Sequence, residues 1–254
     1  MNIIVPFKLV PDLVEELSID VSGTALDTAW LRMIINEFDD HAIEQAIILK
    51  ERTGANVTVL STNIEGVDDL LFTAAAKGAD RLIKLNGDFE SGVNNHTLAR
   101  AMATILRDLK PDLILTGVQA HNDLDGSIGP LLAEYLGMPY IGYVSGVNIT
   151  GDMVTLRKEF PGGLIGEMNV SLPVVLGIQA AELPPRYVAI SKVRQMMKTM
   201  SIDELDFPTS DSRGALVVNR MFQPEAAERA TMLSENANNA ADQLVNIFKE
   251  LGVL

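Results

Sequence analysis

The sequence predicts an α/β fold in which a doubly wound, mostly parallel sheet carries an antiparallel extension and a C-terminal helical arm. Short apolar segments alternate with longer amphipathic segments through the first half of the chain. Near residue 140 this alternation gives way to short apolar segments joined by turns, and the last segment has a helical apolar stripe. Strands that alternate with helices indicate βαβ units and therefore a parallel sheet.

Four strand–helix pairs are expected before residue 140. The strands lie at residues 3–7, 56–61, 81–85 and 112–116, and the helices at residues 36–52, 67–77, 94–109 and 128–136. Gly78 and Gly137 directly follow two of these helices, as glycine often does at a helix C-terminus. Right-handed crossovers place helices on both faces of such a sheet, and ligands bind beyond the carboxyl ends of its strands, where the strand order switches direction.

The second half of the chain is expected to extend the same domain. Strands at residues 144–149, 153–158, 165–170 and 174–178, joined by turns, indicate the antiparallel extension. Residues 182–208 carry prolines, bases and methionines and are expected to form a long exposed loop, and residues 209–224 a linker before a helical segment at 225–251. The predicted organisation is an α/β domain over residues 1–208 and a linker with a helical arm over residues 209–254.

The composition excludes several classes of function. The 254 residues carry a formal net charge of −14, which disfavours a nucleic-acid partner. The chain has no cysteine, which excludes disulfides, thiolate nucleophiles and iron–sulfur clusters within it. The three histidines lie far apart and show no metal-ligand spacing. Because no segment reads as a signal peptide or as a membrane span, we expect a cytoplasmic protein without direct membrane insertion.

The best candidate site is the segment from residue 116 to residue 130, which joins a buried strand to a helix. Gly126, Ser127 and the amides of Ile128 and Gly129 lie where a helix N-terminus offers free N–H donors to a phosphate. The carboxylates of Asp123 and Asp125 in this segment would repel a phosphate unless they face a sugar hydroxyl or cap the helix. A plain loop with Asp caps remains the alternative on pattern alone.

Six short motifs resemble, in their order and spacing, the electron-transfer flavoprotein β-subunit (FixA-like) family. They are Ile3-Ile4-Val5-Pro6-Phe7-Lys8 with Pro11-Asp12, Asn36-Glu37-Phe38-Asp39 with Glu44-Gln45-Ala46, Ala74-Ala75-Ala76-Lys77-Gly78-Ala79-Asp80-Arg81, Gly117-Val118-Gln119-Ala120, Lys158-Glu159-Phe160-Pro161-Gly162-Gly163-Leu164 and Pro184-Pro185-Arg186-Tyr187. The resemblance runs from residue 1 to about residue 200, with a weaker trace in the C-terminal helix. Stress-type proteins share the adenine-nucleotide-binding core of this family but not the last two motifs.

The resemblance implies a heterodimer with an α subunit and one FAD at the αβ interface, held mainly by α. It implies that residues 1–208 form a nucleotide-binding domain for AMP or a second FAD, the latter in electron-bifurcating members. It also implies that electrons pass between dehydrogenases, such as acyl-CoA dehydrogenase, and a quinone reductase or other acceptor, without catalytic side chains. A flavin dehydrogenase is expected to dock at residues 184–200, with Ile190 as the anchor, and the arm at residues 209–254 is expected to pack on the α subunit.

Carried over from the family, the cofactor-binding positions are Pro6, Phe7, Asn36, Thr62, Ala120, Asp123, Gly126, Ser127 and Ile128. Ile128 stands where the family's AMP site has a threonine hydroxyl, which favours a second FAD slightly but leaves both ligands open. The basic cluster usual after the docking segment is reduced to Lys192, Arg194 and Lys198. One alternative is a stand-alone ATP/AMP-binding stress-type protein. A second alternative is a ligase on the same core, but such a ligase needs a Ser-Gly-Gly-type pyrophosphate loop after the first strand, and this sequence lacks that loop.

Overall fold

The computed structural model describes residues 1–87, 89, 94–207, 216–225, 230 and 232–254. The chain divides into two compact units, Met1–Asn219 and Arg220–Leu254. Each unit is described by itself below.

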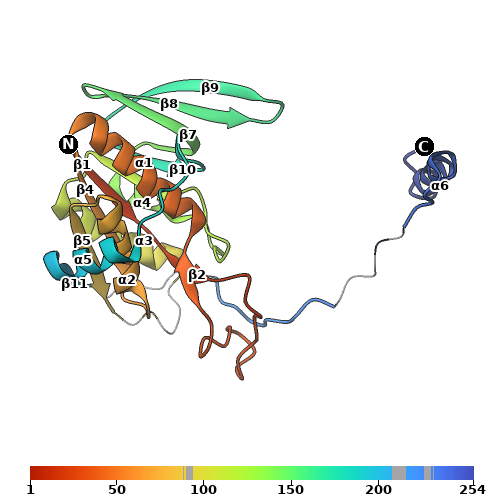
Figure 1. Ribbon diagram of the computed structural model, residues 1–254, viewed down its shortest axis with the longest axis horizontal. Helices are drawn as coiled ribbons and strands as arrows, with labels where there is room; N and C mark the ends of the chain where they lie inside the picture. The colour runs from red at the N-terminus through yellow and green to blue at the C-terminus, as the bar shows by residue number, and fades with distance from the viewer. Residues whose placement is uncertain (88, 90–93, 208–215, 226–229, 231) are drawn as a thin grey trace. The chain divides into compact units, whose positions relative to one another are not determined.

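The first unit is built on a nine-stranded sheet with the strand order β11-β5-β4-β1-β6-β10-β7-β8-β9 (Figure 1). The strands are β1 (Asn2–Pro6), β4 (Asn56–Thr62), β5 (Arg81–Asn86), β6 (Leu113–Gly117), β7 (Tyr140–Thr150), β8 (Met153–Phe160), β9 (Leu164–Ser171), β10 (Val174–Ile178) and β11 (Ile202–Asp206). The pairs from β11 to β7 are parallel, and β7, β8 and β9 pair in antiparallel fashion. This arrangement confirms the predicted α/β fold with an antiparallel extension.

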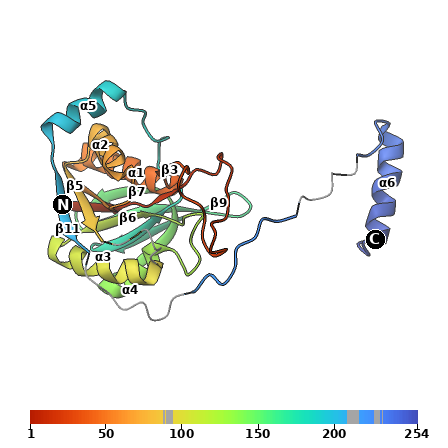
Figure 2. The same ribbon diagram turned by 90° about the horizontal axis from the view of Figure 1, so that it is seen from below.

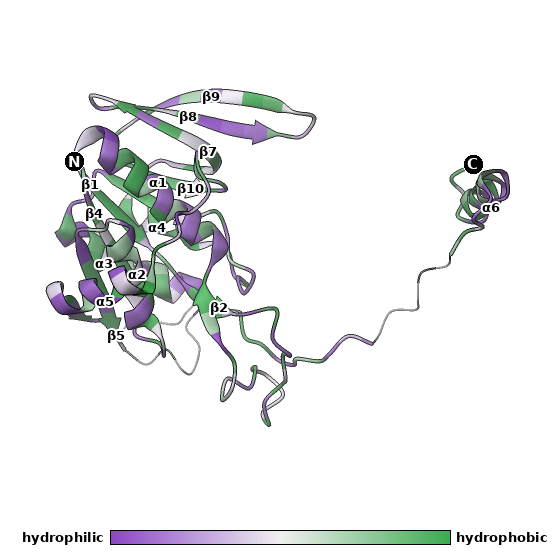
Figure 3. Cartoon of the chain, in the orientation of Figure 1, coloured by the Kyte–Doolittle hydropathy of each residue, from purple (hydrophilic) through white to green (hydrophobic). Residues whose placement is uncertain are grey.

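Five helices cover the two faces of the sheet. They are α1 (Glu37–Thr53), α2 (Val67–Lys77), α3 (Asn95–Leu109), α4 (Ile128–Leu136) and α5 (Ile190–Thr199). Figure 2 shows α1, α2 and α5 on one face and α3 and α4 on the other. Successive strand residues point to opposite faces, so Ile3 and Val5 of β1 pack with α1 and α2, whereas Ile4 packs with α3 and α4. The apolar interior strands stand out in Figure 3.

The position of β10 corrects one expectation. Residues 174–178 were assigned to the antiparallel extension, but β10 lies between β6 and β7 and is parallel to both. All five of its residues are buried. An uninterrupted apolar run is typical of a strand that is covered on both faces of a parallel sheet, and Val-Val-Leu-Gly-Ile is such a run.

The segment after β10 is also more regular than expected. Residues 182–208 were predicted to be an exposed loop, but they contain α5 and the edge strand β11, which pairs with β5. Met196, Met200 and Ile202 pack against the first core cluster. The spacing of four between the two methionines is helical, so these methionines belong in part to ordinary core packing and not only to an adaptable surface.

Residues 9–35 form a feature that the sequence analysis missed. The short strands β2 (Leu9–Pro11) and β3 (Met33–Ile35) make a two-stranded antiparallel sheet. Between them Val14, Val21 and Trp30 are exposed. Three residues are too few for a strand to show a clear alternation of apolar and polar side chains, and this explains why the pattern gave no signal.

The second unit contains α6 (Ala237–Glu250). The side chain of Asn236 accepts N–H groups from Asn238 and Asn239 at its N-terminus, a typical N-cap. The helix therefore starts later than the predicted residue 225, and part of the predicted range, residues 226–229 and 231, lies outside the described residues. Leu244, Val245 and Phe248 are exposed, and no residue of α6 is buried. Within the described residues, no helix is long and apolar enough to cross a membrane.

Candidate functional site

The candidate site lies at the carboxyl ends of β1 and β6, which are neighbours in the sheet. From β1 the chain proceeds to β4 and β5 on one side, and β6 then returns to the other side of β1. This is the switch point at which doubly wound sheets bind ligands. The observed topology therefore places the loops after these two strands at the predicted kind of site.

Asp39, in the first turn of α1, ties the two strand ends together. Its Oδ2 accepts the backbone N–H of Lys8 over 2.9 Å, and its Oδ1 accepts the backbone N–H of Gly117 over 2.7 Å. The residue is only 2% exposed. Burial raises the pKa of Asp39 to about 6, although these two N–H groups oppose the rise. The sequence pattern gives no sign of this clamp, because its two N–H donors come from residues 8 and 117.

Asn36, the residue before α1, holds the loop that follows β6. Its Nδ2 donates to the carbonyl of Gln119 over 2.9 Å, and its backbone N–H donates to the carbonyl of Lys8 over 3.0 Å. The residue is buried. Both loops at the switch point are thus fixed to the start of α1, by Asn36 as well as by Asp39.

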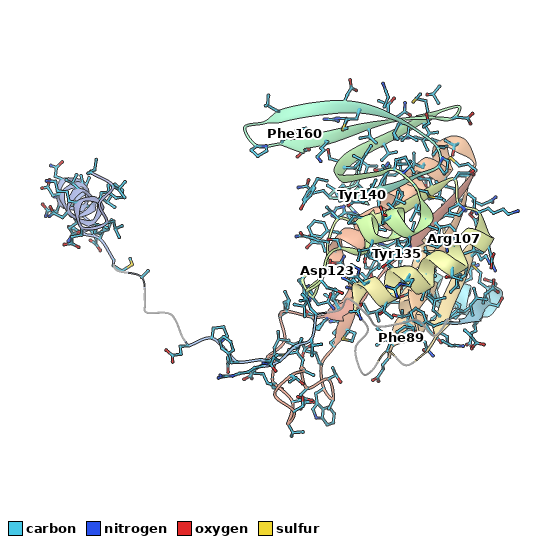
Figure 4. The ribbon with its side chains drawn as sticks, turned by 180° about the vertical axis from the view of Figure 1, so that it is seen from behind. Phe89, Arg107, Asp123, Tyr135, Tyr140 and Phe160 are labelled. Carbon is cyan, nitrogen blue, oxygen red and sulfur yellow. The ribbon has the colours of Figure 1, made fainter. Side chains whose placement is uncertain are left out.

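Asp123 is held inside the loop rather than directed at a ligand. Its Oδ2 accepts the backbone N–H of Ala120 over 2.7 Å, and its Oδ1 accepts from Asn95 Nδ2 over 2.6 Å and from Lys8 Nζ over 2.8 Å. Figure 4 shows Asp123 at the edge of the domain, below α4. Its negative charge is therefore balanced within the protein.

Asp125 has a different role, at the N-terminus of α3. Its carboxylate accepts the backbone N–H of Asn95 over 3.2 Å and that of His96 over 3.5 Å. An acidic side chain is favourable at a helix N-terminus. The carboxylates that would repel a phosphate on sequence grounds are thus engaged elsewhere, one as a helix cap and one in an ion pair.

Two adjacent cavities open at this edge. The smaller is lined by Lys8, Asn36, Asp39, Gly117, Gln119, Ala120, Asp123 and Ile128. The larger, of about 320 Å³, lies between residues 10–14, residues 34–38 and the loop after β6. Asn36 and Gln119 line both. A volume of this order is at the lower end of the range for small-molecule sites.

The N-terminus of α4 borders the smaller cavity through Ile128. Ser127 is the N-cap residue, and its side chain makes no capping hydrogen bond. Pro130, in the first turn, has no N–H, so the amides of Ile128 and Gly129 are the donors that this turn can offer to an anion. Gly126 has a φ of +105°, a conformation that favours glycine.

Gly129 allows α4 to approach the sheet closely. A β-carbon at this position would lie 2.6 Å from the hydroxyl oxygen of Thr116 and 2.9 Å from the ring of Tyr140. Thr116 is fully buried, and within the described part of the chain its hydroxyl has no hydrogen-bond partner. Tyr140 lies beneath α4 (Figure 4), and burial raises the pKa of its hydroxyl to about 12.

The predicted cofactor-binding residues divide into two groups. Asn36, Ala120, Asp123 and Ile128 line the smaller cavity. The remaining five do not line it: they are Pro6, Phe7, Thr62, Gly126 and Ser127. Pro6 and Thr62 end neighbouring strands at the same edge, and Phe7 is buried in the first core cluster.

The structure adds four lining residues that the sequence analysis did not select: Lys8, Asp39, Gly117 and Gln119. A lysine after an apolar strand, such as Lys8, gives no signal of its own in the sequence. Its neighbours come from residues 95 and 123, distant positions that only the fold brings together. Among the described residues, no group of His, Cys, Asp and Glu side chains could hold a metal ion.

A second polar cluster fixes the start of the segment at residues 184–200. Arg186 pairs with Glu44 over 2.8 Å and with Glu51 over 2.6 Å, and Glu44 is 2% exposed. Arg52 pairs with Glu182 over 2.7 Å. These contacts bind the segment to α1. Ile190, the predicted docking anchor, is the first residue of α5 and is 65% exposed.

The fold defines an α/β protein with a mostly parallel sheet and a candidate site at its switch point, and the comparison with known families identifies its class. The chain belongs to the electron transfer flavoprotein family: the model of the electron transfer flavoprotein domain matches residues 25–209. This confirms the resemblance that the motifs indicated.

Individual relatives narrow the similarity to one subunit. The chain is 29% identical to the electron transfer flavoprotein subunit beta of Methylophilus methylotrophus, over 98% of each chain. It is 32% identical to the protein of the same name from Syntrophomonas wolfei, over 72% of each chain. It is also 28% identical to Protein FixA of Azorhizobium caulinodans, over 98% of this chain and 94% of that one.

Proposed function

We propose that this chain is the β subunit of an electron transfer flavoprotein. It forms a heterodimer with an α subunit, and the pair carries electrons through FAD at the αβ interface between a dehydrogenase, such as an acyl-CoA dehydrogenase, and a quinone reductase or another acceptor. The observation that carries this proposal is the similarity to β subunits over 98% of the chain, which includes the docking segment and α6 as well as the sheet. A location in the cytoplasm is part of the proposal.

The site at the switch point binds an adenine nucleotide in this proposal, either AMP or the adenine half of a second FAD. The amides of Ile128 and Gly129 suit a phosphate, and the cavity beside Asn36 suits the adenosine. A cavity of about 320 Å³ has room for one half of FAD, so the flavin half would extend beyond it. When bound, a flavin supplies the electron transfer, and the protein supplies position and electrostatics.

The surfaces for partners are assigned from exposure. The apolar face of α6, with Leu244, Val245 and Phe248, has no cover among the described residues of its own unit, and we assign it to the α subunit. Ile190 on α5 is assigned to the dehydrogenase. An exposed apolar side chain on a helix whose preceding segment is anchored by ion pairs is a suitable contact for a transient partner.

Coexpression with the α subunit tests the proposal. The purified αβ pair should contain flavin by absorbance, and the nucleotides released by denaturation should be counted by liquid chromatography. One FAD and one AMP per pair indicate a structural nucleotide in this subunit, whereas two FAD indicate the bifurcating arrangement. A pair without flavin contradicts the proposal.

The alternative of a stand-alone ATP/AMP-binding stress-type protein makes a different prediction. Such a protein needs neither an exposed amphipathic α6 nor an anchored docking segment. It would elute from gel filtration as a well-behaved particle without an α subunit, and it would bind ATP in that state. The β-subunit proposal predicts a chain that is stable and nucleotide-bound only with its partner.

A further inference from the structure

The side chain of Lys8 reaches across the smaller cavity at the switch point. Its Nζ lies 2.8 Å from Asp123 Oδ1 and 3.1 Å from Asn95 Oδ1. The Lys8 and Asp123 side chains are 16% and 11% exposed. Among the described residues that line this cavity, Lys8 is the one cation, beside the two carboxylates of Asp39 and Asp123.

Asn95 connects this ammonium to the start of α4. Its Oδ1 accepts from Lys8, while its Nδ2 donates to the carbonyl of Gly126 over 2.7 Å. Only one side-chain amide therefore separates Lys8 Nζ from the backbone two residues before Ile128, the first residue of the helix. Lys8 and Ile128 also line the same cavity. The ammonium of Lys8 and the first residue of α4 therefore lie at the same small depression.

The buried hydroxyl of Thr116 lies against the first turn of α4, at Gly129, and it has no hydrogen-bond partner among the described residues. Thr116 lines neither of the two cavities. The donor set that suits a phosphate is therefore the ammonium of Lys8 together with the two free amides of α4.

We propose that Lys8 recognises the phosphate of the bound nucleotide and that it exchanges its partner Asp123 for this phosphate on binding. The inference rests on the proposed function, because it assumes that an adenine nucleotide occupies the switch point. To the proposed function it adds the residue that contacts the phosphate, Lys8, and the ion pair that this contact replaces, Lys8–Asp123.

The exchange leaves no buried charge without partners. When Lys8 moves, Asp123 keeps the backbone N–H of Ala120 at 2.7 Å and the amide of Asn95 at 2.6 Å. Both carboxylate oxygens of Asp123 therefore keep a hydrogen-bond donor. Lys8 exchanges a carboxylate for a phosphate with more charge, and charge-assisted hydrogen bonds are the strong ones. Without this ammonium, two carboxylates would face an anionic ligand.

Opposite effects of two substitutions test the exchange. AMP and adenosine are titrated into the nucleotide-free αβ complex by calorimetry. The dissociation constant of adenosine divided by that of AMP measures the contribution of the phosphate. Lys8→Met should reduce this ratio at least about tenfold, the effect of one charge-assisted contact. Asp123→Asn, which releases the ammonium, should raise it. Lys8→Arg keeps the positive charge and should therefore retain part of the preference for AMP over adenosine.

The possible results separate this inference from the proposed function. If Lys8→Met and Asp123→Asn weaken AMP and adenosine by the same factor, the pair has only a structural role and the exchange is wrong, while the nucleotide site stands. If the parent complex binds neither ligand, the nucleotide site itself is wrong, and the exchange with it. Thermal unfolding of each variant complex shows whether lost binding reflects lost folding.

Discussion

The backbone N–H of Gly117 donates to Oδ1 of Asp39 over 2.7 Å, and a β-carbon at position 117 would lie 2.5 Å from the same oxygen. It would also lie 2.8 Å from the backbone nitrogen of Asp39. The hydrogen bond that joins β6 to α1 therefore needs a glycine at its donor.

Gly117→Ala is expected to destabilise the protein by about 2 kcal/mol or more, because the added methyl group meets backbone and a buried carboxylate, neither of which can move aside. Urea unfolding monitored by circular dichroism measures the loss. Gly146→Ala is the matched control, since its β-carbon would make only ordinary contact with Arg157, at 3.4 Å. That variant should stay within about 0.5 kcal/mol of the parent, and equal losses in both would contradict the argument.

Asp39 should lower the stability of the protein as the pH rises from about 4 to about 6, which is the opposite of the usual effect of a carboxyl group. Burial raises its pKa from 3.8 to about 6, so near pH 5 the folded state holds a proton that the unfolded state has released. Stability from this group is then present below pH 4 and is lost as the pH rises to about 6. The difference corresponds to about 3 kcal/mol at 1.36 kcal/mol per pKa unit.

Asp39→Asn isolates this dependence from that of the other carboxyl groups. The free energy of unfolding is measured between pH 4 and pH 7 for parent and variant, and the variant's value minus the parent's should rise through this window. A flat difference would show that Asp39 is ionised throughout this range of pH.

Arg186 is expected to hold the docking segment to α1. Arg186→Ala leaves Glu44, which is 2% exposed, as a buried carboxylate without its cation. Breaking a buried pair in this way costs several kcal/mol, and because Arg186 itself is 30% exposed we expect about 2 kcal/mol. Protease susceptibility of residues 184–200 should rise in parallel. The control Arg194→Ala, on the exposed side of α5, should change neither quantity.

Gly177 and Tyr140 should be coupled. A β-carbon at position 177 would lie 2.3 Å from the hydroxyl oxygen of Tyr140 and 3.2 Å from the ring carbon that bears it. Gly177→Ala should therefore destabilise by about 1–3 kcal/mol, and Tyr140→Phe should recover part of this loss in the double variant. A double-mutant cycle by urea unfolding measures the coupling, and strict additivity would refute the contact.

Ile190 is expected to affect only the reduction of the αβ complex by its dehydrogenase partner. Ile190→Ala removes most of an exposed apolar side chain, whose burial against a dehydrogenase is worth about 1.5–3 kcal/mol. Reduction of the αβ complex by an acyl-CoA dehydrogenase that is active on the parent should show a KM at least about tenfold higher. Flavin content and complex formation should not change. If both fall instead, Ile190 contacts the α subunit and not the dehydrogenase.

The fold was predictable because its elements repeat simple patterns. The helices at 67–77 and 128–136 were predicted with the bounds that the structure has, since glycine ends each one and each starts after a polar turn. The parallel placement of β10 was not predictable in the same way. A five-residue apolar run has the same local pattern in either orientation, and its partners are β6 and β7, far away in the sequence.

The candidate site was predictable only in its location. The loop after β6 follows from the switch-point rule, but the contacts that shape it join Lys8 to residues 95 and 123, and Asp39 to residue 117. Such long-range pairs leave no periodic trace in the sequence. The assignment of Asp125 as a helix cap shows the same limit, because the helix it caps is α3 and not α4, which follows it directly.

The helix α5 is fastened at both ends: Arg186 ties the segment before it to α1, and β11 directly after it pairs with β5. An inserted or deleted residue in α5 would shift the register of β11 or break the ion pairs, so the length of this segment is effectively locked. If α5 has the docking role proposed above, a new partner can be accommodated by exchange of its outward side chains while the helix itself stays in place.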